Sequence, residues 1–236
     1  MIALSVKGKN SKEILEIMSK NNLTSDLFEV RLDFLEDLTV DNIKKVLQEV
    51  NDKKTRPIIV TLRSRKEGGN FPNKTEDQLD VLLYAISLGV EYIDIELGWP
   101  GKTYKLIEKK KGNTKVIGSY HNLSKTLSVY GLHQIVRKLI WAKSDIVKIA
   151  TFANDIKDNL NLFSTLEFIN KRYKKPAICL AMGEKGMISR VLQTEMGGLL
   201  TFVSASDDEK TATGQLTSQA LSNIKDLLKL NPNQQK

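Results

Sequence analysis

The chain has 236 residues, 41% of them hydrophobic, which is enough to bury a core in one large α/β domain without covalent staples. Its one cysteine, Cys179, excludes an intrachain disulfide, and no apolar run is long enough to cross a bilayer. The net charge of +8 indicates a lysine-rich solvated surface or attraction of an anionic ligand, and nucleic acid is not an expected partner because no basic stripe alternates with aromatic residues.

The cysteine and the first residues indicate where the protein works. Cys179 lies in the apolar run Pro-Ala-Ile-Cys-Leu-Ala, where a core position is expected, and a single thiol fits a reducing compartment. The chain begins Met-Ile-Ala-Leu-Ser-Val-Lys, without the charged segment and long apolar stretch of a signal peptide. We therefore expect a cytoplasmic protein with no membrane partner.

Short runs rich in strand-forming residues alternate with amphipathic stretches from end to end. Strands are predicted at residues 2–6, 27–34, 57–63, 92–97, 115–121, 146–151, 177–182 and 200–204. Helices are predicted at residues 12–20, 41–51, 75–88, 102–111, 129–142, 156–173, 186–193 and 215–229. The polar tail at 231–236 is expected to fray.

About eight such βα units match the count of a (β/α)8 TIM barrel, so we predict an α/β fold with a single domain over residues 1–236. The alternative is a doubly wound open sheet, which usually has fewer strands and a glycine-rich phosphate loop after the first strand. Neither Gly-x-Gly-x-x-Gly nor a P-loop occurs in the chain. No shift in composition and no linker divides it.

A lysine interrupts the sixth predicted strand, which reads Ser-Asp-Ile-Val-Lys-Ile-Ala with Lys148 near its centre. Lysine is almost never fully buried without a partner or a task. Desolvation and cationic neighbours disfavour its charged form, which makes a buried amine available as a nucleophile for Schiff-base chemistry. The alternative is a lysine at a strand end whose ammonium reaches solvent.

Polar residues recur on one parity of five predicted strands. Strand side chains alternate between two faces, and in a barrel one face fills the lumen while the other meets the helices. The polar parity carries Glu29, Arg31 and Asp33; Thr61 and Arg63; Asp94 and Glu96; Ser119 and His121; and Lys148. Polar residues on a single strand could be explained by a strand end that is exposed to solvent. Five strands with charges of both signs predict a polar site at their carboxyl ends.

Two loops add to this predicted site. Residues 61–69 leave the third strand with basic residues and a Gly-Gly pair, and residues 211–215 follow the last strand and the acidic run 207–209. A long loop of small residues at the mouth of a barrel can close over a ligand as a lid. The alternative is an ordinary surface turn.

In order and spacing these segments resemble the type I 3-dehydroquinate dehydratases of the shikimate pathway. The resemblance covers nearly the whole chain, and each segment is weak alone, but their combination is highly specific. The segments are Glu29-Val30-Arg31, Thr61-Leu62-Arg63 with Glu67-Gly68-Gly69, Asp94-Ile95-Glu96, Ser119-Tyr120-His121-Asn122, Val147-Lys148-Ile149-Ala150, Met182-Gly183 with Ser189-Arg190, and Gly214-Gln215.

The resemblance implies a (β/α)8 barrel that needs no metal or organic cofactor, acts on the anionic substrate 3-dehydroquinate and works as a homodimer. It implies that Lys148 forms an imine with the substrate ketone, that His121 is the general acid and base, and that Glu67 orients and polarises His121. It further implies that Arg190 binds the substrate carboxylate with Gln215. The residues implied to hold the ring hydroxyls and position the substrate are Glu29, Arg31 and Arg63.

One segment departs from the family pattern. The family's lid usually reads Ser-Ala-Pro-Gly-Gln, whereas this chain reads Thr-Ala-Thr-Gly-Gln from Thr211 to Gln215. Thr211 keeps the hydroxyl, and with it the hydrogen bonding of a substrate-binding residue. Thr213 in place of the proline loosens the loop, which affects lid closure rather than chemistry.

The chemistry can also be argued from the residue types. Dehydration next to a ketone requires removal of a poorly acidic α-proton, and a protonated imine is a better electron sink than the ketone. One histidine can take that proton and then protonate the leaving hydroxyl, because its pKa is near neutral. Of the two histidines, His121 ends a strand, whereas His133 lies in a helical pattern where a surface or core position is expected.

Two other functions remain open at this point. A Schiff-base aldolase on the same barrel would also use Lys148, but with a phosphorylated or short keto substrate in place of a carboxylated ring. A non-catalytic barrel that binds anions would need only the basic charge of the chain.

Overall fold

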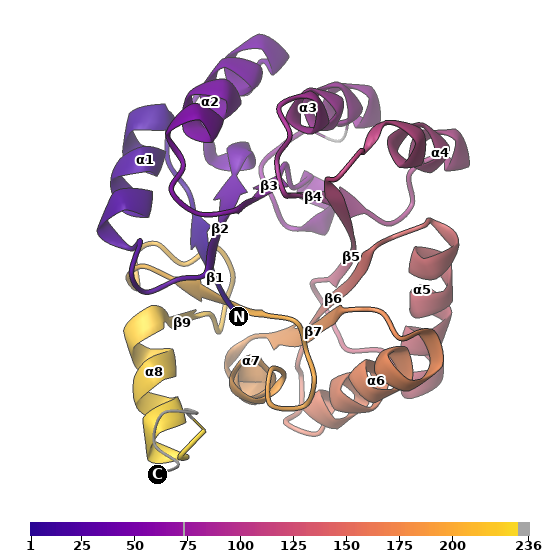
Figure 1. The fold of residues 1–236 in the computed structure, drawn as a ribbon. Helices are drawn as coiled ribbons and strands as arrows, with labels where there is room; N and C mark the ends of the chain where they lie inside the picture. The colour runs from indigo at the N-terminus through magenta and orange to yellow at the C-terminus, as the bar shows by residue number, and fades with distance from the viewer. Residues whose placement is uncertain (73, 231–236) are drawn as a thin grey trace.

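The computed structural model of the protein describes residues 1–72 and 74–230, and a ring of strands lies at its centre (Figure 1). The strands of the ring are β1 Ile2–Val6, β2 Leu27–Arg31, β3 Ile58–Thr61, β4 Tyr92–Glu96, β5 Lys115–Asn122, β6 Ile146–Phe152, β7 Ala177–Met182 and β8 Thr201–Ser204. The short strand β9 Leu216–Thr217 adds to the sheet beside β8.

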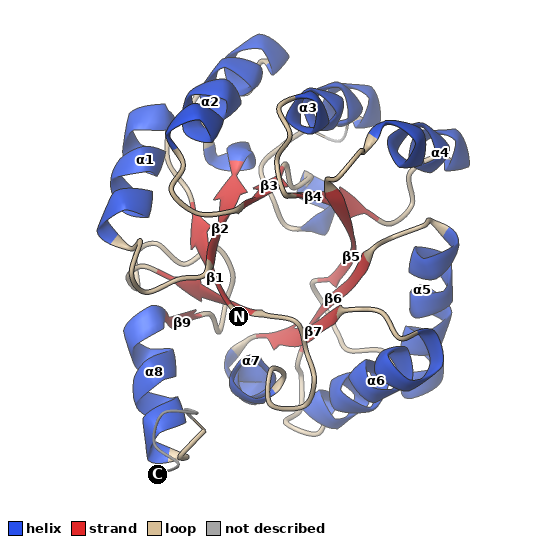
Figure 2. Ribbon diagram, viewed as in Figure 1, coloured by secondary structure: helices blue, strands red, loops and turns tan. Residues whose placement is uncertain are grey.

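Helices surround the ring, one after nearly every strand (Figure 2). They are α1 Ser11–Lys20, α2 Val40–Lys53, α3 Thr75–Ser87, α4 Gly101–Lys110, α5 Val129–Trp141, α6 Asp158–Tyr173, α7 Met187–Leu192 and α8 Ser218–Leu227. This alternation confirms the predicted (β/α)8 barrel.

All paired strands of the described sheet run parallel, so the carboxyl ends of the strands meet on one side of the ring. The hydrogen-bonded order is β7-β6-β5-β4-β3-β2-β1-β8-β9. At the remaining seam, Leu199 just before β8 donates its backbone N–H to the Ala177 carbonyl at the start of β7, at 2.8 Å. The side chains at the carboxyl ends of the strands therefore lie together on this side of the ring, which we call the mouth.

The core has an outer and an inner part. Outward-facing strand residues such as Val30, Val60 and Ile93 pack against the helices. Inside the ring, side chains of alternate strands share a layer, as expected for this barrel type. Strand positions assign Leu27, Tyr92, Ile146 and Leu200 to the first layer, and Ala3, Ile59, Ile117 and Ile178 to the second. We call these eight apolar residues the lower layers.

Two predicted boundaries are wrong by three residues. The strand predicted at 27–34 ends at Arg31, because Leu32–Phe34 forms a 3-10 turn closed by a hydrogen bond from the Leu35 N–H to the Leu32 carbonyl. The helix predicted from 215 begins at Ser218, because the two preceding residues pair with β8 and the Thr217 side chain caps the helix by accepting from the Ala220 N–H. The predicted frayed tail, 231–236, lies outside the described residues.

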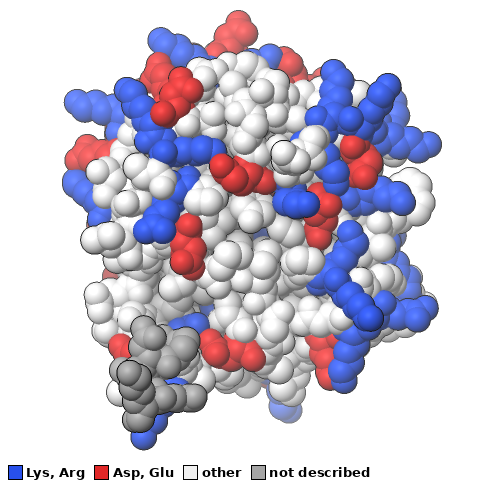
Figure 3. Space-filling model, viewed as in Figure 1, with Lys and Arg blue, Asp and Glu red and all other residues white. Residues whose placement is uncertain are grey.

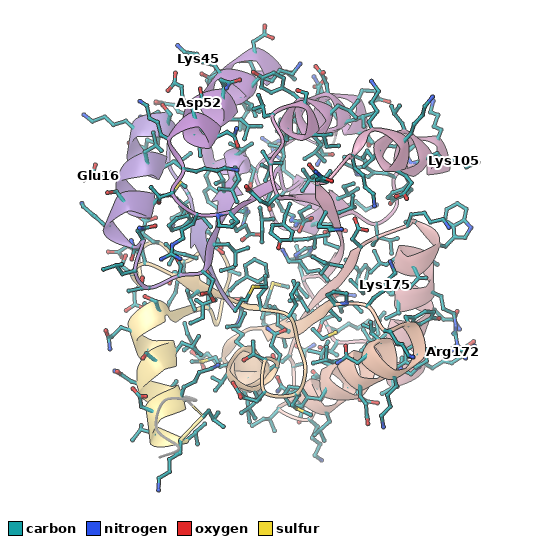
Figure 4. All side chains as sticks on the ribbon, viewed as in Figure 1. Glu16, Lys45, Asp52, Lys105, Arg172 and Lys175 are labelled. Carbon is teal, nitrogen blue, oxygen red and sulfur yellow. The ribbon has the colours of Figure 1, made fainter. Side chains whose placement is uncertain are left out.

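The surface carries the basic charge. On the face shown in Figure 3, Lys and Arg lie mostly around the rim with Asp and Glu among them, and Lys45, Lys105 and Arg172 point away from the helices in Figure 4. Cys179 is buried and free, as expected for a core thiol. No helix in the described part of the chain is long and apolar enough to span a bilayer.

Candidate active site

The carboxyl ends of the strands open into a cavity of about 540 Å³. All nine residues that the sequence proposed for a site line it: Glu29, Arg31, Arg63, Glu67, His121, Lys148, Arg190, Thr211 and Gln215. Among the described residues, nine buried ones are Asp, Glu, Lys or Arg, and all lie at this mouth: Glu29, Arg31, Asp33, Arg63, Glu67, Asp94, Glu96, Lys148 and Arg190. The alternative that these polar residues sit at strand ends in water is therefore wrong.

Lys148 is 5% exposed and belongs to the third layer of the lumen. The other members of this layer come from alternate strands and surround its amine. Nζ donates to Glu29 Oε1 at 3.2 Å and to Asp94 Oδ2 at 3.0 Å, and it lies 4.3 Å from the centroid of the Phe202 ring. The alternative of an ammonium that reaches solvent is therefore wrong, and the direct partners of Nζ are carboxylates rather than the cationic neighbours we expected.

The two carboxylates beside Lys148 stay ionised. Burial by itself would raise the pKa of Glu29 and of Asp94, but positive charges outweigh it. Lys148 and Arg31 lower the pKa of Glu29, and Arg63 and Lys148 lower that of Asp94 further. The amine therefore sits between two proton acceptors in a site that is shielded from water.

Arg63 gathers three carboxylates beside this layer. Its Nη1 lies 3.2 Å from both Glu67 Oε2 and Glu96 Oε1, and its Nη2 lies 2.8 Å from Asp94 Oδ1. These charges outweigh burial and raise the pKa of Arg63. Buried ion pairs of this kind hold side chains in fixed positions when every charge is partnered. Arg63 thus fixes the carboxylates around the cavity that it lines.

His121 and Glu67 form a pair that sequence distance would not reveal. His121 Nδ1 lies 2.8 Å from Glu67 Oε2, although the residues are 54 positions apart. Glu67 ends a 3-10 turn, Arg65–Glu67, that follows β3. The chain turns tightly after it, and a Cβ at Gly69 would overlap the carbonyl oxygen of Arg63. The Gly-Gly pair in this loop thus lets Glu67 reach the end of β5.

The environment keeps both members of this pair neutral near pH 7. Burial, and then the charges of Arg63 and Lys148, hold the pKa of His121 well below its usual value. Burial raises the pKa of Glu67 to about 8 despite Arg63, and the charges of Glu96 and Asp94 add to the rise. A neutral imidazole carries its proton on one nitrogen, and the other nitrogen can accept a proton as a general base must; the protonation of Glu67, which contacts Nδ1, decides which nitrogen is free.

Arg31 is held on one side by its own segment. Its Nε and Nη2 each lie 2.8 Å from an oxygen of Asp33, and the guanidinium stacks 4.9 Å from the centroid of the Phe34 ring. The 3-10 turn that overrides the predicted strand places both partners. The Asp33 pair holds the guanidinium in place through Nε and Nη2. Nη1 takes no part in it and can donate hydrogen bonds to a ligand.

Arg190 differs from the other buried cations because no carboxylate of the described residues pairs with it. It lies in α7, is 2% exposed and lines the cavity. Its Nε has no hydrogen-bond partner, and its Nη2 only approaches the Thr213 carbonyl at 3.5 Å. Burial lowers its pKa to about 10, which leaves it charged near pH 7. An unpaired buried guanidinium is a ready partner for the carboxylate of a ligand.

The loop at 211–215 lies over this mouth. Gln215 is 2% exposed; its Oε1 accepts from the Thr211 N–H at 2.8 Å, and its Nε2 donates to Ser5 Oγ at 3.2 Å. Ser5 in turn donates to Glu29 Oε2 at 2.8 Å, so hydrogen bonds connect the loop to the partner of Lys148. A Cβ at Gly214 would overlap the Gly183 carbonyl oxygen, which explains the glycine. The effect of Thr213 on closure stays a prediction.

Several residues in or beside the cavity had no expected role. Asp94 was placed on the polar parity without its contact to Lys148, and Ser5 and Phe202 were not considered. Both lie on the lumen parity of β1 and β8, so strand alternation alone could have found them. His133 is in α5, stacked 3.7 Å from the Phe168 ring centroid, as expected for a helical histidine away from the mouth. In the described ranges, no group of three or more His, Cys, Asp or Glu could hold a metal ion.

The model of one protein family, type I 3-dehydroquinase, matches residues 2–232. The chain belongs to the type I 3-dehydroquinase family. It is 34% identical over 233 residues to the 3-dehydroquinate dehydratase of Methanocaldococcus jannaschii, covering 98% of this chain and 100% of that protein. It is 38% identical over 221 residues to the chloroplastic bifunctional 3-dehydroquinate dehydratase/shikimate dehydrogenase of Arabidopsis thaliana. That match covers 93% of this chain but 34% of the plant protein, so the chain spans about a third of its length.

Solved structures agree with the family. A type I 3-dehydroquinate dehydratase from Clostridium difficile, solved with covalently modified comenic acid, superposes with a TM-score of 0.86 at 28% identity. The match covers 96% of this chain and 91% of that one. The family's barrel therefore extends over the described part of the chain.

Proposed function

We propose that this protein dehydrates 3-dehydroquinate to 3-dehydroshikimate in the shikimate pathway, through an imine on Lys148. The observation that carries the proposal is the buried amine of Lys148, held by two carboxylates in a cavity that also contains a neutral histidine. Membership of the type I 3-dehydroquinase family supports the substrate. The relative from Clostridium difficile, solved with a covalently modified ligand, is consistent with covalent chemistry at such a site.

The first step is formation of the imine. Nζ of Lys148 attacks the ketone carbon, a carbon–nitrogen bond forms, and the ketone oxygen leaves as water after taking up protons. Glu29 Oε1 and Asp94 Oδ2, at 3.2 and 3.0 Å from Nζ, can accept and return these protons. The Phe202 ring covers the amine from another side and limits the access of water. This layer therefore does the carbonyl chemistry.

The second step is elimination. His121 takes the proton on the carbon next to the imine, and the electron pair moves toward the imine nitrogen. His121 then gives this proton to the leaving hydroxyl, which departs as water, and hydrolysis of the imine frees Lys148. With Nδ1 held by Glu67, the nitrogen that exchanges the proton is Nε2. The net reaction releases one water molecule.

The remaining residues position the ring. Arg190 clasps the substrate carboxylate, since a guanidinium offers two parallel N–H groups to a carboxylate, and Thr211 and Gln215 close over it from the loop. Glu29 and the free edge of Arg31 hold ring hydroxyls. Arg63 positions the substrate together with the three carboxylates that it binds.

Trapping the imine tests the proposal and separates it from the alternatives. Sodium borohydride with 3-dehydroquinate should add the reduced ligand to the peptide that contains Lys148, and Lys148→Met should lose both the adduct and turnover while it remains folded. Lys111→Met is the matched control, because Lys111 is also paired with a carboxylate, that of Asp145 at 2.8 Å, but at the other end of the strands.

Three results would reject the proposal. An adduct on another lysine, or one that persists in Lys148→Met, would reject the role of this residue. Trapping with short sugar phosphates but not with 3-dehydroquinate would indicate an aldolase. Tight binding without any trapping would indicate a module that only binds anions.

The proposal also covers the setting of the reaction. One barrel domain over the whole chain acts in the cytoplasm, without a metal or organic cofactor and as a homodimer. The single buried thiol supports a reducing compartment. Sedimentation of the purified protein measures the oligomeric state directly.

A further inference from the structure

A second cavity of about 410 Å³ lies outside the barrel wall, toward the gap between α4 and α5 (Figure 1). Glu67 and His121 line both this outer cavity and the one at the mouth. This pair therefore forms part of the wall between them, with the lumen on one side and the outer cavity on the other. Strand alternation explains the arrangement, because Tyr120 precedes His121 in β5 and faces the outer side.

Four Trp and Tyr side chains line the outer cavity. Trp99 and Tyr104 come from the segment after β4, Tyr120 from β5 and Trp141 from the end of α5. Trp141 is 69% exposed and packs across Gly101, where a Cβ would lie 3.3 Å from its ring. Aromatic faces that line a cavity and remain open to solvent are typical of sites that stack a planar ring.

The cavity also has a charge pattern. Two exposed lysines line it, Lys66 and Lys138, of which Lys138 lies in α5 with Trp141, while Glu67 lies on the inner wall. A ligand with one anionic group thus has a favoured orientation, in which the anion meets Lys138 and the ring faces the inner wall. A volume of about 410 Å³ lies in the range of small-molecule sites and leaves room for one or two fused rings.

The inner wall is fixed in position before any ligand arrives. The Tyr104 hydroxyl donates to the Glu96 carbonyl at 2.9 Å and accepts from the Gly98 and Trp99 N–H groups at 3.1 Å each. The Glu96 side chain in turn accepts from the Ser64 N–H at 2.8 Å and lies 3.2 Å from Arg63. The same segment therefore positions an aromatic wall of the outer cavity and a carboxylate of the mouth.

We propose that the outer cavity binds a planar aromatic carboxylate, with its ring among Trp99, Tyr120 and Trp141 and its carboxylate toward Lys138. The occupant contacts Glu67 and His121 from the outer cavity, on the side away from the lumen. It therefore lowers turnover without competing with the substrate for the mouth. Energetic coupling between two sites requires such shared structural elements.

Tryptophan fluorescence gives a direct readout, because the chain has two tryptophans and both line this cavity. Benzoate is the probe, and we expect a saturable change in emission. Cyclohexanecarboxylate, which has the charge without the aromatic ring, and benzyl alcohol, which has the ring without the charge, should each bind more weakly. This test needs no turnover, so its outcome is independent of the proposed function.

Variants locate the bound probe. Lys138→Gln should weaken benzoate binding up to about fivefold, the size of one partly exposed ion pair. Trp141→Leu keeps the apolar bulk but removes the aromatic face, and should weaken binding about three- to tenfold. Both residues are exposed, so both variants should fold. Arg190→Gln, which removes the free cation of the mouth, should leave benzoate binding unchanged.

Turnover measurements complete the test. Benzoate should lower kcat for 3-dehydroquinate with KM unchanged in the wild type, and Trp141→Leu should need more benzoate for the same effect. Competition with substrate, or loss of binding in Arg190→Gln alone, would place benzoate in the mouth and overturn the proposal. No saturable fluorescence change, including the case of a cavity covered by a second copy of the chain, would overturn it as well, and so would binding without effect on kcat.

Discussion

The lower layers of the lumen and the third layer above them are built from opposite kinds of residue. The lower layers are apolar, and Ile59, Ile117 and Ile178 at their centre are completely buried. The third layer combines Glu29, Asp94 and Lys148 with one aromatic ring, Phe202. On β2, only two residues separate Leu27 of the lower layers from Glu29 of the third layer, yet one region serves stability and the other chemistry.

The buried charges of the third layer are tolerated because they are paired. Each charged group of the third layer has an oppositely charged neighbour, and Arg63 adds a second partner for Asp94. A buried pair of this kind gives little net stability relative to apolar residues, although breaking it is costly. The apolar lower layers supply the stability that lets the upper layers be polar.

The largest expected effect separates the two histidines. His121→Ala should lower kcat by roughly 10² to 10⁴, the usual contribution of a general acid and base. Borohydride should still trap the imine in this variant, because Lys148 and its carboxylates are unchanged. His133→Ala, in the helix packed against Phe168, should behave like the wild type. If His133 were the essential residue, the account of the mouth would be wrong.

The next effect tests the lower layers. Ile59→Ala should lower the free energy of unfolding by about 2–5 kcal/mol, because it leaves a cavity beside completely buried neighbours. Imine trapping in the folded fraction should be unchanged. Ile156→Ala is the control, since this side chain is 61% exposed and its loss should change stability by no more than about 0.5 kcal/mol. A loss of trapping in folded Ile59→Ala would show that the layers are not separable.

A smaller effect concerns the unpaired guanidinium. Arg190→Lys keeps the charge but loses the paired N–H geometry, so KM should rise about 10- to 100-fold, corresponding to one charge-assisted hydrogen bond. Gln215→Ala should raise KM less, by about two- to tenfold. Arg172→Lys, on the outer surface of α6, is the matched control (Figure 4). Steady-state kinetics would contradict the assignment if KM stayed constant while kcat fell.

The smallest effect is the pH dependence set by Glu67. Its pKa of about 8 means that the carboxyl is protonated below this pH and then donates to His121 Nδ1, which leaves the proton on Nε2. Above it, the ionised carboxylate accepts from Nδ1–H and frees Nε2 as a base. kcat/KM should therefore rise by up to about tenfold per pH unit and level off above about pH 8. Glu67→Gln should remove this rise of kcat/KM with pH. If the rise persisted in the variant, it would belong to the titration of another group.

The count of βα units was enough to predict the barrel, and side-chain alternation along the strands was enough to predict the polar mouth. Alternation placed Glu29, Arg63 and Lys148 on one parity because a buried strand shows its two faces directly in the sequence. It could not show that Asp94 meets Lys148, because that contact depends on which strands share a layer. Once the barrel is assumed, alternate strands should be compared, and Phe202 would also have been found.

Loops and turns limited the rest of the prediction. The resemblance to the family pointed to Glu67, but its position depends on a 3-10 turn and a Gly-Gly pair rather than on periodicity. The strand was predicted to continue past Arg31 because Leu32 fits the alternation of apolar and polar residues. In the structure the chain bends there into a 3-10 turn, and Arg31 forms two hydrogen bonds with Asp33. The alternation of apolar and polar residues does not record such side-chain contacts.

The most direct test of the central claim is a crystal structure of the complex reduced by borohydride in the presence of 3-dehydroquinate. We predict a covalent bond from Lys148 Nζ to the former ketone carbon, with the ligand carboxylate against Arg190 and Gln215. His121 Nε2 should lie about 3 Å from the carbon or hydroxyl that exchanges the proton. A carboxylate far from Arg190, or a ligand with His121 on its opposite side, would contradict the account.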